Sequence, residues 1–249
     1  MLIQSDYHIH ASFYRVKKPT DIPGPTAAEQ IAAAREAGSV YVGIVEHCNT
    51  SAKHPFYCLK DLAAEYYSSG FSRENVFLGV ESDLSPDGSD HCGCAGRKEL
   101  DLHYVIGSVH CSPSSIPDLR DYFDFEYRCI TNALTSNDNI DIIGHPFGEG
   151  IRWERQGIIP RWNWSLIPEQ YLDDILRLAR ETGKALEINR CRFEDPVYLD
   201  FLARIRDEKI IFETGSDAHQ TASHLKSGER TRFLENMNFN EEQHWKPFL

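Results

Sequence analysis

The sequence predicts an α/β fold with seven parallel strands in a closed or nearly closed barrel, as a single domain over residues 1–249. Three observations lead to this fold class. Short β-rich segments alternate with longer helical segments, which is typical of parallel strands joined by helices. Seven such units follow one another without a visible break. A chain of 249 residues can also bury one full core.

The predicted strands are short runs rich in Val, Ile and Leu. Several are continuously apolar, as expected for parallel strands that are covered by helices on one face and packed on the other. The seven strands are Leu2–Ile9, Val40–Val45, Val76–Val80, Tyr104–Val109, Ile140–Gly144, Ala185–Asn189 and Ile210–Gly215.

Helix signals lie between these strands. The segment 26–29 has the form of a capping box, and Gly38 marks the end of the helix that follows it. Pro196 is favourable at the start of another helix. The remaining predicted helices are Leu59–Ser69, Asp118–Thr135, Pro168–Thr182, Pro196–Asp207 and a last one within His224–Met237.

Two connections are longer than the usual 2–6 residues and are therefore candidate binding loops. One covers residues 82–100. The other covers residues 146–164 and carries Trp153, Trp162 and Trp164 together with three arginines. Two interpretations of this second loop stay open: it closes over an aromatic ring of a substrate, or it is a flap that packs on the core.

Composition narrows the class of protein. The net charge of −12 argues against tight binding to a nucleic-acid backbone. No apolar run approaches the roughly 20 residues that span a membrane, and residues 1–6 lack the features of a signal peptide. We therefore expect a cytoplasmic protein. The seven cysteines are expected to be reduced, and Cys92 and Cys94 match no common zinc motif.

Imidazole and carboxylate side chains occur at the C-terminal ends of six predicted strands, which is the rim where barrels built from parallel strands form active sites. His8 and His10 are two residues apart and should project from one face of a strand, as should Asp217 and His219 if the last strand extends that far. Any one of these residues could be structural, but their shared position predicts a metal site. The candidate ligands are His8, His10, His47, Glu81, His110, His145, Asp217 and His219.

This ligand set suits Zn, Mn or Fe. Eight ligands are too many for one tetrahedral ion and enough for two or three divalent ions. Clustered ions can bind a phosphate oxygen, activate water and stabilise a leaving group. The remaining histidines do not share this placement, and we expect them at the surface: His54, His91, His103, His224 and His244.

The chain resembles the PHP family, the polymerase and histidinol phosphatase domain, over nearly its whole length. The resemblance consists of Asp-x-His-x-His at residues 6–10, Gly-x-Glu at 79–81, Gly-His-Pro at 144–146 and Ser-Asp-Ala-His at 216–219, with His47 and His110 after other strands. Residues 186–189, Leu-Glu-Ile-Asn, are similar to the family as well.

The resemblance implies a distorted seven-stranded TIM-like barrel, written (β/α)7, and a metal-dependent phosphoesterase with up to three ions. By the family pattern, His8, His10, Glu81 and Asp217 would hold the first ion. Glu81, His110 and His145 would hold the second, and His47 and His219 would help to hold a third. Many members carry a further histidine shortly after His-x-His, whereas residues 11–15 here contain none, so the third site is expected to be weaker or to use a distant ligand such as His54.

The function we expect is hydrolysis of a small phosphomonoester by attack of a metal-activated water on phosphorus, with histidinol phosphate or a nucleoside monophosphate as substrate. Asp217 and His219 are the candidates for proton transfer to the leaving oxygen. Arg190 and Arg192, which follow the sixth strand, are candidate phosphate ligands or ordinary surface cations.

Two alternatives belong to other classes. A non-catalytic metal-binding module of the polymerase-associated type would keep the ligands without turnover. Metal-dependent hydrolysis of a C–N bond is favoured less, because no Lys occupies a strand end where amidohydrolase barrels usually carry a bridging one.

Overall fold

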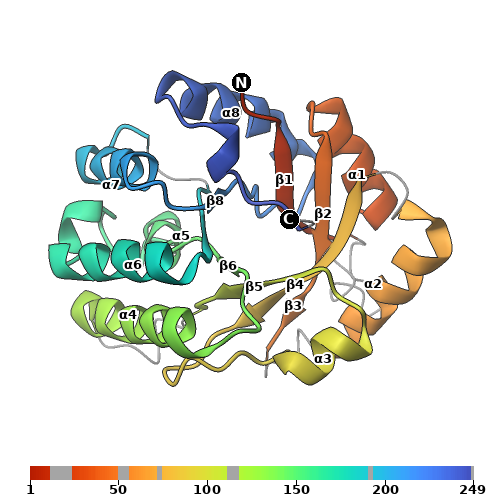
Figure 1. Cartoon of the computed structure of the whole chain (residues 1–249), viewed down its shortest axis with the longest axis horizontal. Helices are drawn as coiled ribbons and strands as arrows, with labels where there is room; N and C mark the ends of the chain where they lie inside the picture. Colours follow the sequence, from red (N-terminus) through yellow and green to blue (C-terminus); the bar gives the residue numbers. More distant parts are fainter. Residues whose placement is uncertain (12–23, 50–55, 72–74, 111–117, 190–192, 248–249) are drawn as a thin grey trace.

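The computed structural model describes residues 1–11, 24–49, 56–71, 75–110, 118–189 and 193–247. Its strands form a parallel sheet in the order β1-β2-β4-β5-β6-β7-β8, with the short β3 paired to β4. Helices surround the strands, with α4, α6 and α7 on one side and α1 and α2 on the other (Figure 1). The expected TIM-like fold is confirmed.

The strands are short and lie close to the predicted positions. They are β1 Ser5–His10, β2 Tyr41–Val45, β3 His47–Cys48, β4 Val76–Asp83, β5 Tyr104–Ser108, β6 Ile142–Ile143, β7 Ala185–Glu187 and β8 Phe212–Glu213. β2 and β3 are two pieces of one strand position, separated at Glu46. Several predicted strands extend beyond the paired residues; the predicted Ile140–Gly144, for example, contains the shorter β6, Ile142–Ile143.

The α-helices are α1 Ala27–Glu36, α2 Phe56–Ser69, α3 Gly93–Glu99, α4 Leu119–Ser136, α5 Glu149–Arg155, α6 Glu169–Thr182, α7 Pro196–Asp207 and α8 Ser227–Asn236. Short 3₁₀ turns are η4 Trp164–Leu166, η5 Thr221–Lys226 and η6 Glu241–Gln243.

The capping box of α1 is present as predicted. Thr26 N donates to Glu29 Oε2 at 2.8 Å, and Glu29 N donates to Thr26 Oγ1 at 3.2 Å. Two helices were not predicted: α3 and α5, which lie inside the two long connections. Each has seven residues, and such short helices contain too few turns to show an apolar repeat.

The barrel is distorted where β1 meets β8. Ile9 pairs with Ala218, beyond the end of β8, and His10 N donates to Ala218 O at 2.9 Å. At the start of β8, the C-terminal segment lies in the place of a neighbouring strand, since Trp245 N donates to Phe212 O at 2.8 Å. The gap between β1 and β8 is thus bridged differently at its two ends.

The side chain of Tyr104 crosses the narrow interior of the sheet. Its hydroxyl donates to Tyr7 O at 2.5 Å. A Cβ at Gly43 would lie 2.1 Å from that hydroxyl, and a Cβ at Gly79 would lie 2.4 Å from the ring. Glycine is therefore required at both positions, and the aromatic side chains close the barrel beneath the rim.

Candidate metal centre

The structure brings together all eight predicted ligand side chains at the C-terminal rim of the sheet. They come from β1, β3 and β4 and from the segments that follow β5, β6 and β8. The side chains of His8, His10 and Glu81 have no exposed surface, whereas 20% of His110, 24% of His219 and 30% of Asp217 is exposed. The cluster therefore has a buried floor and a mouth that faces solvent.

Glu81 lies at the centre of the cluster and contacts imidazoles from four parts of the sheet. The shortest approaches are 2.7 Å from Oε2 to His47 Nδ1 and 2.9 Å from Oε1 to His145 Nε2. Nε2 of the other three histidines lies slightly farther from a Glu81 oxygen: His8 at 3.3 Å, His10 at 3.4 Å and His110 at 3.4 Å. A single carboxylate with both oxygens shared in this way could bridge two cations.

Imidazole nitrogens also face one another. His8 Nε2 lies 3.1 Å from His10 Nε2, and His47 Nε2 lies 3.3 Å from His219 Nε2. Two neutral imidazoles can form a hydrogen bond at such a contact only if one nitrogen carries a proton and the other does not. His10 Nδ1, in addition, is buried with no hydrogen-bond partner among the described residues. Crowded nitrogen donors around carboxylates are the arrangement that a divalent cation stabilises.

Three groups of side chains have ligand atoms within 4.8 Å of one another. They are His8, His10 and Asp217; His47, Glu81 and His110; and His10, His47 and His219. The first is part of the first ligand set expected from the family pattern. The second places His47 beside Glu81, and the third places it beside His10, so His47 lies nearer to the two-ion core than that pattern implies.

β8 ends at Glu213, so the condition on which Asp217 and His219 were expected to alternate along a strand is not met. Asp217 has a left-handed backbone, with φ 49°. The two side chains are still in contact, with His219 Nδ1 3.3 Å from Asp217 Oδ1. Asp6 fixes the segment from below by accepting a hydrogen bond from Ser216 N at 2.9 Å.

His145 after β6 is held in a similar way. Its φ is 27°, and Phe147 two residues later has φ 56°. Non-glycine residues in this region cost of order 1–3 kcal/mol each and concentrate at functional sites. The segment is held by Glu126 of α4, which accepts a hydrogen bond from Phe147 N at 2.5 Å.

Two carboxylates that we did not predict support the ligands. Glu187 on β7 accepts from His8 Nδ1 at 2.8 Å and from His145 N at 2.6 Å. Asp83 at the end of β4 accepts from His110 Nδ1 at 2.7 Å. Each carboxylate fixes a proton on Nδ1 and leaves Nε2 directed at the centre, as outer carboxylates do in histidine metal sites.

The charges of the inner residues are coupled. Burial alone would lower the pKa of His8, but the carboxylates of Glu187 and Glu81 outweigh it and raise that pKa well above its usual value. The pKa of His110 is raised in the same way by Glu81 and Asp83. Burial opposes ionisation of Glu81, but the surrounding imidazoles hold its pKa well below the usual range. Protons here balance the buried carboxylate in the absence of another cation.

The pKa values of His47 and His219, the candidate ligands of a third ion, are shifted in the opposite direction. Burial, together with the neighbouring His10, lowers the pKa of His47 to about 4. Burial likewise lowers the pKa of His219 to about 4, although Asp217 opposes this shift. Both rings are neutral at pH 7 and present a lone pair, which is the form that binds a metal.

Several predictions concern residues outside the described part of the chain. Arg190, Arg192 and His54 lie there, as do residues 12–15. Of the histidines expected at the surface, His91 is exposed, whereas His224 and His244 are buried, with 1% and 4% exposure. That expectation is wrong for these two, because each has polar partners from distant parts of the chain.

The three tryptophans of the second long connection are buried, with Trp162 fully so. Trp153 packs on Tyr122, and Trp164 packs on Tyr198. The structure therefore supports the packing interpretation of this segment and contradicts the interpretation as a lid over a substrate ring.

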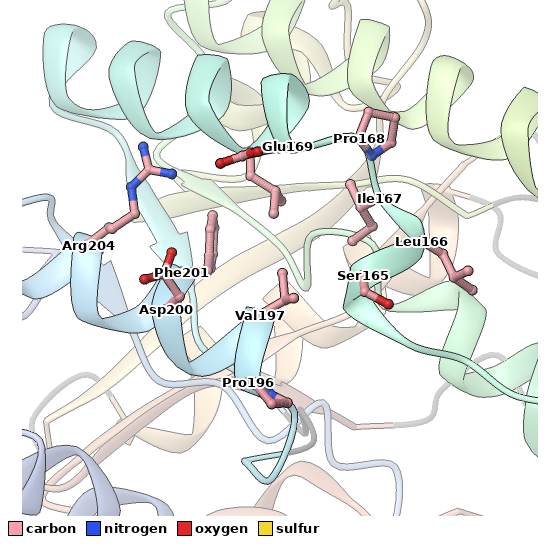
Figure 2. A pocket seen from close by; sticks show the side chains of 11 residues that line it. Ser165, Leu166, Ile167, Pro168, Glu169, Pro196, Val197, Asp200, Phe201 and Arg204 are labelled. Carbon is pink, nitrogen blue, oxygen red and sulfur yellow. The ribbon is translucent and has the colours of Figure 1, made fainter.

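A separate pocket with a volume of about 630 Å³ lies outside the barrel, between α6 and α7 (Figure 2). Its walls include Ile167, Val197 and Phe201, and none of the eight candidate ligands lines it. Arg204 at its edge pairs with Asp173 at 2.6 Å. The pocket is thus distinct from the metal centre.

Comparisons with known proteins agree with this geometry. The sequence is 25% identical over 228 residues to the DNA polymerase/3'-5' exonuclease PolX of Bacillus subtilis, covering 87% of this chain and 34% of that protein. The fold matches a histidinol phosphate phosphatase of Lactococcus lactis complexed with Zn, L-histidinol and phosphate, with a TM-score of 0.61 and 16% identity over 97% of this chain and 96% of that one. The chain is thus similar in sequence and in fold to proteins of the PHP type.

The chain spans about a third of the length of the polymerase that it matches. At 16% identity, the Lactococcus structure establishes the fold. An archaeal ribonuclease P structure with mature tRNA aligns more weakly, with a TM-score of 0.46 and 14% identity, covering 94% of this chain and 83% of that one. No family model matches the sequence. None of the helices in the described ranges is long and apolar enough to cross a membrane.

Proposed function

We propose that this PHP-type chain is a metal-dependent phosphatase that hydrolyses small phosphomonoesters. The observation that carries the proposal is the convergence of imidazole and carboxylate side chains on Glu81, below a mouth formed by partly exposed His110, Asp217 and His219. A phosphoryl group is small and carries two negative charges, so it suits a site whose mouth is open and whose floor is built to hold cations.

The ligands divide around the shared carboxylate of Glu81. His8, His10 and Asp217 would hold one ion with it, and His110 and His145 a second, with His47 and His219 at a third position. The donor set fits, because every imidazole offers a nitrogen to the centre and the outer carboxylates orient two of the rings. When bound, such ions would neutralise charge on phosphoryl oxygens and lower the pKa of a water molecule.

Asp217 and His219 are the proposed proton-handling groups of the mouth. Asp217 Oδ1 lies 3.3 Å from His219 Nδ1, so it favours a proton at that nitrogen. With its pKa lowered to about 4 by burial, the His219 ring is neutral at pH 7, and its Nε2 can accept a proton when no ion occupies the third position.

The proposed substrates are histidinol phosphate and nucleoside monophosphates. The Lactococcus structure contains L-histidinol and phosphate, which supports an amino-alcohol phosphate as the first candidate. Arg190 and Arg192 follow β7 in the sequence and are proposed to bind phosphate oxygens.

The relationship to PolX favours a second candidate function. That relative is a polymerase and exonuclease, and the similarity covers only 34% of it. A polymerase-associated module of this fold would bind metal without releasing phosphate from small esters.

The deciding experiment is phosphate release by the purified full chain after removal of metal and reconstitution with Zn, Mn or Fe. The panel contains histidinol phosphate, nucleoside monophosphates and bis-p-nitrophenyl phosphate as a phosphodiester probe. Release from one of the monoesters, with two or more metal ions bound per chain, is expected.

Glu81→Gln is the matched negative control, since it keeps the size of the side chain and removes the shared charge. Bound metal without release from any ester, under all three metals, would favour the non-catalytic module. Turnover of the diester alone would contradict the phosphomonoesterase proposal while keeping the metal centre.

A further inference from the structure

Two thiols lie directly behind the metal centre. Cys48 follows His47 in β3, and Cys92 lies at the N-terminal end of α3. Both side chains are buried, with 4% and 8% exposure. Both cysteines lie against Ser82, and their thiols are close enough to shift each other's pKa. Residues 44 positions apart in sequence thus meet at the end of the sheet that carries the ligands.

Ser82 on β4 fixes the geometry of this pair from both sides. It is the pairing partner of Cys48 in the parallel register of β3 and β4. Its Oγ accepts a hydrogen bond from Cys92 N at 2.8 Å and donates to Asp90 Oδ1 at 3.2 Å. The start of α3 is also tied down, because Gly93 N donates to Asp90 Oδ1 at 2.7 Å. The two sulfur atoms are therefore held together by backbone that is itself hydrogen-bonded.

The pair does not have the composition of a metal site. Among the described residues, neither Cys48 nor Cys92 belongs to any group of three ligand atoms close enough to share an ion. Zinc sites use three or four protein ligands. Two adjacent thiols without further ligands have another chemistry available, which is oxidation to a disulfide.

We propose that Cys48 and Cys92 form a disulfide when the protein meets a peroxide, and that this bond inhibits the neighbouring metal centre. One thiol sulfur attacks the peroxide O–O bond, becoming a sulfenic acid and releasing water. The second sulfur then attacks the sulfenic sulfur and expels a second water. The two thiols lose two electrons, and hydrogen peroxide is reduced to two waters. The effect on turnover rests on the proposed phosphatase function, whereas the disulfide itself does not.

The bond would act on the site through His47. The sulfurs of a disulfide lie about 2.05 Å apart, closer than two unbonded thiols, so closing the bond draws Cys48 towards α3. His47 is the next residue, and its Nδ1 lies 2.7 Å from Glu81 Oε2. A displacement of about 1 Å in such a group can cost about 100-fold in rate.

The test uses the zinc-loaded full chain treated with hydrogen peroxide. Zinc has no redox chemistry, so oxidation of the metal cannot imitate the effect. Free thiols are blocked with N-ethylmaleimide, and the protein is digested with trypsin without reductant. Mass spectrometry should then find residues 36–53, which contain Cys48, joined to residues 74–97.

The peptide 74–97 also contains Cys94, which is exposed, so two variants separate the possibilities. Cys94→Ser should keep the joined peptides, and Cys92→Ser should lose them. Phosphate release by the oxidised wild type should fall roughly 10-fold or more and return with dithiothreitol. Cys92→Ser should keep its rate in peroxide.

Absence of the joined peptides in oxidised Cys94→Ser would overturn the proposal. So would joined peptides with unchanged zinc content and unchanged phosphate release. A reduced protein without phosphatase activity would instead end the proposed function. The thiol pair would then be judged by the joined peptides and by loss of zinc from the oxidised chain.

Discussion

The barrel contains two kinds of buried histidine, and their difference identifies the functional end of the molecule. His224 and His244 each have separate polar partners: His224 Nε2 lies 3.0 Å from Gln30 Oε1, and His244 Nε2 lies 2.9 Å from Ser5 Oγ. At the ligand end, by contrast, rings stack on rings, with the centroids of His10 and His219 4.1 Å apart.

This contrast shows how a structural histidine differs from a candidate ligand. A ring with its own hydrogen-bond acceptor stabilises the fold without any added ion. A cluster of rings around one carboxylate leaves several nitrogens competing for the same charge, so it needs protons or metal ions. The predictions below separate the two groups by asking which substitutions release metal and which lower stability.

The largest effect is expected from Glu81→Gln. The amide keeps the shape of the side chain but removes the charge that five imidazoles share. Metal affinity should fall by more than about 100-fold, beyond the range seen for outer partners of metal ligands. Metal content after dialysis, measured by plasma mass spectrometry, checks this.

Glu213→Gln is the matched control. Glu213 on β8 is also fully buried, but burial raises its pKa well above the usual value, and Glu187 raises it further. A carboxyl that is already neutral loses no charge on conversion to an amide. Metal loss from Glu213→Gln equal to that from Glu81→Gln would contradict the central role of Glu81.

The outer carboxylates should matter less and unequally. Glu187→Gln is expected to weaken metal binding by about 10- to 100-fold, because it orients the His8 ring and also holds the His145 backbone. Asp83→Asn affects only the His110 ring, and 18% of the Asp83 side chain is exposed. Its effect should lie near the lower end of that range.

Titration of each metal-free variant with Zn²⁺ against a competing chelator measures the difference. Equal affinities of the two variants and the wild type would show that these carboxylates only neutralise charge and do not orient the rings.

Substitution of a structural histidine should lower stability and leave metal binding unchanged, whereas substitution of a ligand should do the opposite. His224→Ala removes the hydrogen-bond partner of the buried Gln30 Oε1 and the ring nitrogen Nδ1 that lies 3.5 Å from Asp6 Oδ2. The substitution should therefore cost about 1–3 kcal/mol of unfolding free energy. The metal content of this variant should not change. His10→Ala should lose metal with little loss of stability in the metal-free protein. Urea unfolding of both metal-free variants tests this, and a metal-depleted but equally stable His224→Ala would contradict the division.

The ligand set could be predicted from sequence because each member follows an apolar run, and parallel strands bring those ends together. The capping box of Thr26 was equally local, since both partners lie within four residues. Local patterns of this kind contain the information needed to place a residue on the rim.

The supporting residues could not be predicted in the same way. Glu187 lies within a strand, so its contact with His8, 179 residues earlier, has no local signal. The burial of His224 depends on Gln30, 194 residues away. Asp217 and His219 lie on the rim as expected from their position after the last strand, but their mutual contact has no signal in the sequence. Their contact depends on a left-handed turn beyond β8, and alternation within a strand has no part in it.

The smallest predicted effect is a proton count. In the metal-free protein at neutral pH, His8 and His110 carry protons, because neighbouring carboxylates outweigh burial and raise their pKa. Those protons must leave when a cation binds, so metal binding should release protons and tighten as pH rises through these pKa values. His47 and His219, with pKa values lowered to about 4, have no proton to release at pH 7.

Calorimetry of Zn²⁺ binding at pH 7 in buffers of different ionisation enthalpy measures this number. His110→Ala should release about one proton fewer than the wild type, whereas His219→Ala should release the same number although it also removes a candidate ligand. The pair is matched in chemistry and differs only in the charge of the ring that is lost. If both variants lowered the count equally, the carboxylates would not distinguish the inner rings from the pair at the mouth, and the imidazoles would form one titrating cluster.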